Sequence, residues 1–202
     1  MGKFKLLYFA SKGRGQPIRL LLHIAGVDFD DVKVTRKEWK DIKANMPHRK
    51  LPVLEVDGNL ISQSGAILRY LGREFGYYGS NNVEKTRIDV ISGAVDDIIF
   101  LMERLFYNET VEAAKEKLKK EMVSWRLEEF LGIMEETLKE NHNGDTFFVG
   151  DQVSIADIQV YNVLDVIPEY FSDHAINMPP KLTAFVQRFK DIQNVKNFLN
   201  KT

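Results

Sequence analysis

The chain has 202 residues, of which 44% are hydrophobic and 28% charged, a composition typical of a globular protein that buries a core. Its 28 basic and 29 acidic residues leave a formal net charge of -1, so we expect neither nucleic acid nor an anionic membrane as a partner. Cysteine is absent, which excludes disulfides, cysteine nucleophiles and thiolate metal sites. The four histidines are scattered without metal-ligand spacing, and we expect no metal.

The amino-terminal part of the chain begins with a strand, a helix and a second strand. Residues 3–8 start with polar/apolar alternation and then turn apolar, which predicts a half-buried strand and leaves no room for a signal peptide. Pro17 suits the first turn of a helix, and Gly26 stands where that helix should end. Residues 31–34 predict the second strand. The polar stretch that follows, up to Met46–Pro47, is expected to be irregular.

A hairpin and a helix complete this first part. Asp57–Gly58 between the apolar runs 52–56 and 59–61 is the strongest short-range signal of a β-hairpin. Ile67 opens a helical pattern of apolar residues that ends near Gly76. The order β-α-β followed by β-β-α predicts a small α/β domain over residues 1–79.

Residues 80–202 predict an all-helical second domain. Apolar residues recur from Ile88 to Leu105 at steps of three and four, and a second long helix is expected over 111–139. The charged run from Lys115 to Glu121 is expected to face solvent. Ser154–Asp157 fits a capping box, and Pro180 opens another helix.

Five ordered sequence pieces make this two-domain pattern specific. They are Tyr8–Phe9 with Gly13–Arg14–Gly15 and Pro17–Ile18–Arg19, then Trp39 with Lys43, then Lys50–Leu51–Pro52–Val53–Leu54, then Gln63–Ser64, and the capping box within Gly150–Asp157. Together they resemble the cytosolic glutathione transferases, and the sigma class in particular, over essentially the whole chain. The resemblance implies a thioredoxin-like first domain. The chain departs from the family at His48–Arg49, where Phe-Gly is common.

The resemblance makes Tyr8 the catalytic residue, assisted by Arg14. Glutathione carries a thiol with an unperturbed pKa of about 8.5, so little of it is thiolate near neutral pH. A protonated phenol can donate a hydrogen bond to the sulfur anion, and the positive end of the following helix adds a favourable field. A lone tyrosine here would more often be a half-buried strand aromatic. The surrounding motif favours the catalytic role.

The resemblance also implies a set of glutathione contacts: Tyr8, Arg14, Trp39, Lys43, Lys50, Leu51, Pro52, Gln63, Ser64 and Asp97. A cis Leu51–Pro52 bond would turn the Leu51 backbone toward the cysteinyl residue. Gln63 and Ser64 precede a helix whose amides suit the γ-glutamyl carboxylate, although Ser64 can also be a plain N-cap. By resemblance, Asp97 reaches glutathione on the neighbouring subunit of a homodimer. A solvated acidic face is an equal alternative for Asp97.

An electrophile pocket is expected between the two domains. Its candidates, besides Arg14, are Phe9, Gly13, Ile99, Arg104, Gln159, Val163 and Leu199. Gln159 and Val163 differ from the residues that we associate with prostaglandin-isomerising members, so conjugation of hydrophobic electrophiles, including lipid-peroxidation aldehydes, is the default expectation. A detoxifying cytoplasmic enzyme with glutathione as co-substrate follows.

Three alternatives stand beside this prediction. The first is a glutathione-dependent prostaglandin D isomerase. The second is a protein of little activity, either crystallin-like or a carrier of hydrophobic ligands. The third, a thioredoxin-type oxidoreductase, needs an active-site cysteine and is excluded by composition.

Overall fold

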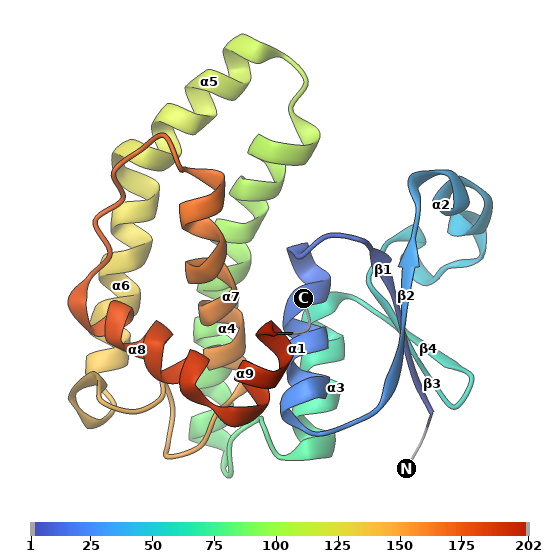
Figure 1. Cartoon of the computed structure of the whole chain (residues 1–202), viewed down its shortest axis with the longest axis horizontal. Helices are drawn as coiled ribbons and strands as arrows, with labels where there is room; N and C mark the ends of the chain where they lie inside the picture. Colours follow the sequence, from blue (N-terminus) through green and yellow to red (C-terminus); the bar gives the residue numbers. More distant parts are fainter. Residues whose placement is uncertain (1–2, 201–202) are drawn as a thin grey trace. The chain divides into compact units, whose positions relative to one another are not determined.

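The computed structural model describes residues 3–200, which fall into two compact units. The first comprises the chain up to Tyr78 together with the segment from Asp191 onward, and the second is Gly79–Lys190. A four-stranded sheet with helices makes up the first unit, and the second is helical (Figure 1). The predicted fold class, a thioredoxin-like α/β domain followed by an all-helical domain, is confirmed.

The sheet of the first unit has the strand order β2-β1-β3-β4. Its strands are β1 (Phe4–Phe9), β2 (Phe29–Val34), β3 (Val53–Val56) and β4 (Asn59–Ser62). β1 runs parallel to β2, while β3 is antiparallel to both β1 and β4. The parallel pair needs a crossover helix, and the antiparallel pair needs only the Asp57–Gly58 turn. Both connections agree with the sequence prediction.

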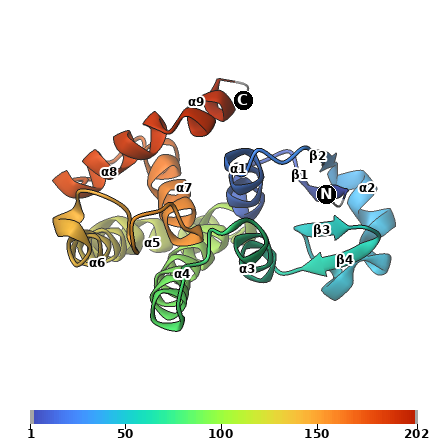
Figure 2. The same ribbon diagram turned by 90° about the horizontal axis from the view of Figure 1, so that it is seen from below.

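Two helices cover one face of this sheet, α1 (Gln16–Ile24) and α3 (Ser64–Phe75), as Figure 2 shows. Pro17 lies in the first turn of α1, as predicted. α1 packs against α3, and its apolar side chains are almost wholly buried. The largest fully buried aliphatic residues of the unit form this layer: Leu6, Ile18, Leu20, Leu21, Leu22, Leu54, Ile67, Leu68 and Leu71.

A further helix, α2 (Arg36–Ile42), occupies the stretch that the sequence analysis expected to be irregular. That expectation was wrong. Thr35 caps the helix: its hydroxyl accepts from the Glu38 amide at 3.2 Å, while the Glu38 carboxylate accepts from the Thr35 amide at 2.8 Å. The Thr35 hydroxyl also donates to the Glu38 carboxylate at 2.7 Å, and this bond together with the one from the Thr35 amide lowers the pKa of Glu38. α2 has no buried residue, so it lacks the apolar face by which a helix is recognised in a sequence.

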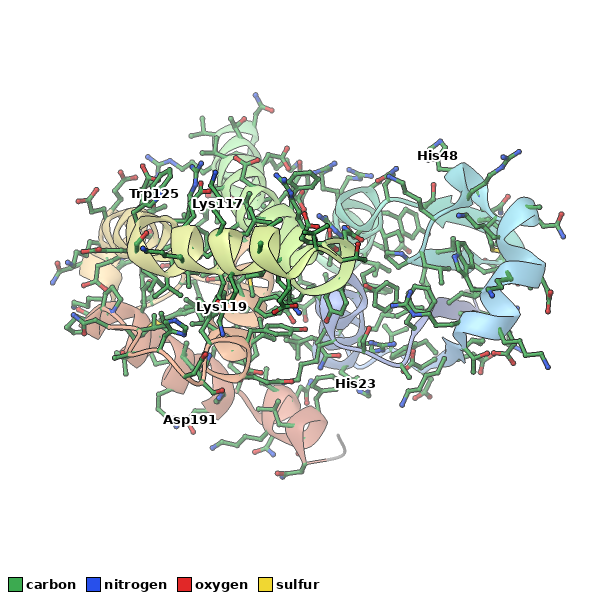
Figure 3. The ribbon with its side chains drawn as sticks, turned by 90° about the horizontal axis from the view of Figure 1, so that it is seen from above. His23, His48, Lys117, Lys119, Trp125 and Asp191 are labelled. Atoms are coloured by element: carbon green, nitrogen blue, oxygen red, sulfur yellow. The ribbon has the colours of Figure 1, made fainter. Side chains whose placement is uncertain are left out.

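The last described helix, α9 (Gln193–Leu199), belongs to the first unit. It packs on α1, where Asn194 Nδ2 donates to the Ile24 carbonyl at 2.9 Å. Phe198 is buried, with its ring 4.8 Å from that of His23, which Figure 3 labels. The structure therefore differs from the expected division at residue 79, because the chain returns to the first unit after Lys190.

The second unit is built around α4 (Asn82–Glu103) and α7 (Ile155–Tyr170), which pack against each other. α6 (Leu127–Lys139) and α8 (Pro180–Asp191) complete it, and Asp191 is the one residue of α8 grouped with the first unit. Short π-helical turns follow α4 (Arg104–Asn108) and precede α6 (Met122–Arg126). The helix predicted over 111–139 is thus divided into α5 (Glu112–Glu121), a π turn and α6.

Two smaller predictions for this unit are confirmed. α5, along which Lys117 and Lys119 lie (Figure 3), has no buried residue, and Lys117 and Lys120 face solvent as predicted, while Lys119 is half-buried and pairs with Asp173 at 2.6 Å. The Ser154–Asp157 capping box begins α7, with the Asp157 carboxylate accepting from the Ser154 amide at 2.8 Å. Within residues 3–200, no helix is both long and apolar enough to cross a membrane.

Candidate active site

The strand register brings the predicted catalytic and binding segments of the first unit to one edge of the sheet. Leu7 of β1 pairs with Val53 of β3, and Val53 pairs with Ser62 of β4. The next residues outward along each strand are Tyr8, Pro52 and Gln63. Three segments that are far apart in the sequence therefore meet where β1 ends, β3 begins and β4 ends. Their meeting defines the candidate site.

Tyr8 is 8% exposed and points its ring toward the turn that leads into α1. Its hydroxyl oxygen accepts a hydrogen bond from the Arg14 amide at 3.1 Å. Arg14 belongs to η1 (Gly13–Gly15), a single 3-10 turn that continues directly into α1. The phenol oxygen is thus held by a backbone donor, and its own proton can be donated to an anion. The amino-terminal turn of α1 adds a positive partial charge at the same place.

Two glycines of η1 make room for the Tyr8 ring. A Cβ atom on Gly13 would lie 2.6 Å from the Tyr8 hydroxyl oxygen, and a Cβ on Gly15 would overlap the ring at Cδ1. Gly13 also has a φ of 35°, a backbone conformation that residues with a side chain rarely adopt. The Gly13–Arg14–Gly15 sequence is therefore explained by close approach of the backbone to the phenol. Gly13, predicted to line the electrophile pocket, contacts Tyr8 itself.

Arg19, which belongs to the Pro17–Ile18–Arg19 motif, supports the candidate site through buried contacts. It is 6% exposed, and its guanidinium forms an ion pair with Asp31 at 3.0 Å. It also donates to the carbonyls of Ser11, at 2.8 Å, and Phe9, at 3.1 Å. Its Cζ atom lies 5.7 Å from the centre of the Tyr8 ring. Arg19 thus fixes the loop that follows Tyr8. In the sequence, a charged residue inside the apolar run of α1 indicates such a buried ion pair.

The peptide bond between Leu51 and Pro52 is cis, as predicted. Pro52 is buried and Leu51 is half-buried, immediately before β3. The Leu51 backbone therefore lies at the same sheet edge as Tyr8.

Gln63 joins β4 to α3 in an unusual backbone conformation, with φ at 70° and ψ at 111°. Non-glycine residues held at positive φ tend to occur at functional sites. α3 starts at Ser64, and Gln63 is its N-cap without a side-chain capping hydrogen bond. The plain capping role considered for Ser64 is therefore not the one found. The first amides of α3 point toward the site edge and can bind a carboxylate.

The remaining predicted contacts of the first unit lie on or after α2. Trp39 is half-buried and packs edge-on against Phe9, with ring centres 6.2 Å apart. Lys43 and Lys50 are exposed. Leu199 is half-buried at the end of α9.

The second unit carries the other five candidates. On α4, Asp97 is exposed and Ile99 half-buried, and Arg104 is exposed in the π turn that follows. On α7, Val163 is 1% exposed and Gln159 is 4% exposed. Gln159 accepts a hydrogen bond from Ser92 at 2.6 Å, a buried contact that joins α7 to α4. This contact gives Gln159 a structural role, while the pocket roles of Ile99, Arg104, Gln159 and Val163 and the glutathione contact of Asp97 stay predictions.

Sequence comparison with known families gives matches in both units. Residues 3–73 match the family described as "Glutathione S-transferase, N-terminal domain", and residues 96–202 match "Glutathione S-transferase, C-terminal domain". The S-crystallin SL11 of Nototodarus sloanii is 33% identical over 202 residues, which cover 100% of this chain and 97% of the crystallin.

Solved structures are similar over the same span. The Pi-class glutathione S-transferase of Onchocerca volvulus is 32% identical with a TM-score of 0.89, covering 98% of this chain and 93% of that one. The prostaglandin synthase D of Nilaparvata lugens is 31% identical with a TM-score of 0.89, covering 98% of both chains. The two family matches and these full-length similarities establish that the chain belongs to the glutathione transferase family.

Proposed function

We propose that this transferase activates glutathione through Tyr8. The observation that carries the proposal is the Tyr8 hydroxyl, which accepts from the Arg14 amide where η1 continues into α1. A phenol can accept one hydrogen bond at its oxygen and donate its own proton in another, so Tyr8 can donate to the cysteinyl sulfur of a bound glutathione. The bound thiol loses its proton to solvent, and the phenol and the helix terminus stabilise the thiolate. The thiolate then attacks an electrophilic carbon and a carbon–sulfur bond forms. With an aryl halide the halide leaves with its electron pair, and with an unsaturated aldehyde the conjugated double bond opens and takes up a proton from solvent.

The rest of the glutathione molecule is assigned to the segments around Leu51, Gln63 and α2. The Leu51 backbone, beside the cis Pro52, pairs with the cysteinyl backbone. The amides that open α3, with the side chains of Gln63 and Ser64, bind the γ-glutamyl carboxylate. Trp39, Lys43 and Lys50 bracket the glycine end, whose carboxylate carries the opposite charge to the two lysines.

The proposed second substrate is a hydrophobic electrophile. Phe9 and Gly13 lie next to Tyr8 in the first unit and are the best-supported residues of its pocket. The similarity to a prostaglandin synthase D keeps prostaglandin isomerisation as an alternative, and the similarity to an S-crystallin keeps a protein of little activity. Turnover of a chlorodinitrobenzene by the wild-type protein separates an enzyme from a crystallin-like protein. Product analysis with a prostaglandin endoperoxide tests the isomerase.

Sigma class, a homodimer and a cytoplasmic location complete the proposal. Asp97 is exposed on α4, so its carboxylate can reach the glutathione amino group of a second copy. Sedimentation of the wild-type protein tests the dimer. If Asp97 acts across it, Asp97→Asn raises the KM for glutathione and leaves the sedimentation of the protein unchanged.

The decisive experiment is Tyr8→Phe, which removes the phenol oxygen and keeps the ring. We expect the pKa of the bound thiol to rise toward the value of about 8.5 for a free thiol, and turnover to fall roughly tenfold for each unit of that rise. The pH dependence of kcat/KM and the ultraviolet absorbance of the thiolate both measure it. Tyr77→Phe is the matched control, because the Tyr77 hydroxyl donates to Ile24 at the opposite end of α1. A thiol pKa that is equal in Tyr8→Phe and wild type rejects the role of Tyr8.

A further inference from the structure

A side-chain hydrogen bond connects two of the segments assigned to glutathione. His48 Nδ1 lies 3.1 Å from the Ser62 hydroxyl oxygen. His48 belongs to η3 (Pro47–Arg49), the turn that leads into Lys50, Leu51 and the cis Pro52. Ser62 is the last residue of β4 and precedes Gln63. The contact therefore joins the segment before β3 to the end of β4.

Both segments have backbone conformations that are unfavourable for their residues. His48 has a φ of 53°, Arg49 a φ of 51° and Gln63 a φ of 70°. None of the three is glycine, and each such conformation persists only where surrounding contacts hold it. The antiparallel pairing of β3 with β4 ends at Val53 and Ser62, so the strand ladder stops short of all three residues. The His48 side chain adds a hydrogen bond from outside the ladder to Ser62 of that last pair.

We propose that the His48–Ser62 hydrogen bond is a positioning contact that fixes the spacing between the Leu51 backbone and the amino terminus of α3. This inference rests on the proposed function, in which those two groups bind the cysteinyl and γ-glutamyl parts of one glutathione molecule. His48 is exposed and is not placed on the sulfur. Its role is thus to set the affinity for glutathione and not the reactivity of the thiolate.

The chemistry of the two groups makes the contact specific. A neutral imidazole can accept the Ser62 hydroxyl proton at Nδ1 or donate to the hydroxyl oxygen, depending on its tautomer. An apolar side chain at position 48 can do neither. Asparagine is the closest replacement, since its amide is short, can donate or accept, and tolerates the left-handed backbone conformation.

The test is a double-mutant cycle with His48→Ala, Ser62→Ala and the double variant, measured by steady-state kinetics with glutathione varied. Each single variant should raise the KM for glutathione about three- to tenfold, the size expected when one hydrogen bond is lost. kcat at saturating glutathione and the pKa of the bound thiol should stay within experimental error of the wild type. The double variant should be no worse than either single variant, because both remove the same contact.

Three further variants separate the contact from other effects. His48→Asn should restore a KM within twofold of the wild type. His48→Gly relieves the positive φ but cannot bond to Ser62, so its KM should stay raised. His142→Ala is the control, since His142 also has a positive φ of 47° and is exposed, but lies in the second unit. Its KM should equal that of the wild type.

Two results would overturn the proposal: KM values in His48→Ala and Ser62→Ala equal to that of the wild type, or effects that add in the double variant. A failure of the proposed function looks different. In that case the wild-type protein neither binds to a glutathione affinity resin nor conjugates glutathione to an electrophile, so the failure is already seen in the wild type and not only in the variants.

Discussion

At the residue scale, Tyr8 is held from several sides. The Arg14 amide donates to its oxygen, Gly13 and Gly15 lie against its ring, and Arg19 fixes the loop behind it. The residue types were all visible in the sequence, and Tyr8 was identified from them by resemblance. The sequence could not show that the two glycines leave room for the phenol, because the distance between the turn and the ring is known only from the structure.

Gly13→Ala tests this close approach. The new methyl group would lie 2.6 Å from the Tyr8 oxygen, so the hydroxyl must move away from its position beside the Arg14 amide. We expect kcat/KM to fall tenfold or more, equivalent to about 1.4 kcal/mol of transition-state stabilisation, with a raised thiol pKa. The control is Gly58→Ala in the β3–β4 turn. Gly58 also has a positive φ, of 83°, but a Cβ there meets nothing within 4 Å. Gly13→Ala kinetics that match those of Gly58→Ala would contradict the prediction.

At the scale of elements, capping residues decide where two of the helices begin. The Thr35–Glu38 box starts α2, a short helix with no apolar face, which apolar periodicity in the sequence therefore does not reveal. The Ser154–Asp157 box starts α7 and was recognised, since a strongly apolar helix follows. Asp157 differs from Glu38 in being fully buried. Its carboxylate accepts from the amides of Phe148 and Ser154 and from the Ser154 hydroxyl.

Burial makes the stability of α7 dependent on pH through Asp157. Desolvation raises the pKa of Asp157 to about 6, against opposing hydrogen bonds from Ser154 and Phe148. The folded state therefore binds this proton more tightly than the unfolded state, whose pKa is near 3.8. The resulting stabilisation is complete below pH 4 and is lost as pH rises through 6, with an upper limit of about 3 kcal/mol.

Asp157→Asn supplies the measurement, because the amide does not titrate. The unfolding free energy of wild type minus that of Asp157→Asn, from urea titrations, should decrease between pH 4 and pH 7. The subtraction removes the contributions of other titrating groups. A difference that is constant with pH, or one that grows as pH rises, would show that desolvation does not dominate at Asp157.

At the scale of the whole molecule, charge is unevenly distributed along the chain. Residues 33–50 contain seven lysines and arginines but only two acidic residues, whereas the full chain has a net charge of -1. This cationic segment includes α2 and leads to the Leu51–Pro52 bond. Glutathione is an anion near neutral pH, and its thiolate carries a further negative charge. The segment should therefore attract it over distances beyond direct contact.

Salt should weaken this attraction, because the screening length falls to about 10 Å at 0.1 M ionic strength and about 3 Å at 1 M. We expect the KM for glutathione to rise several-fold between about 0.05 and 0.5 M sodium chloride. Replacing Arg36, Lys37 and Lys40 by glutamine should flatten this dependence. Replacing Lys117 and Lys120 of α5 by glutamine should preserve it, since both lie in the second unit. A KM that does not respond to salt in the wild type would reject long-range steering.

The sequence predicted most of the fold because its elements carry local signals. Each of these signals spans only a few residues. Examples are the hairpin turn at Asp57–Gly58, Pro17 at the start of α1 and the apolar periodicity of α4. The contacts that depend on register or on distant segments were not predictable. Among them are the alignment of Tyr8 with Pro52 and Gln63, the His48–Ser62 contact, and the return of α9 to α1.

The return of α9 has a consequence for how the protein is made. Asn194 bonds to Ile24 across 170 positions of the chain, and it leaves the ribosome only after the whole helical unit has been synthesised. While the nascent chain is still being elongated, the surface of α1 that Val195 and Phe198 cover stays open to solvent. The thioredoxin-like unit is thus begun first and finished last, and its completion waits for the helical unit to be synthesised.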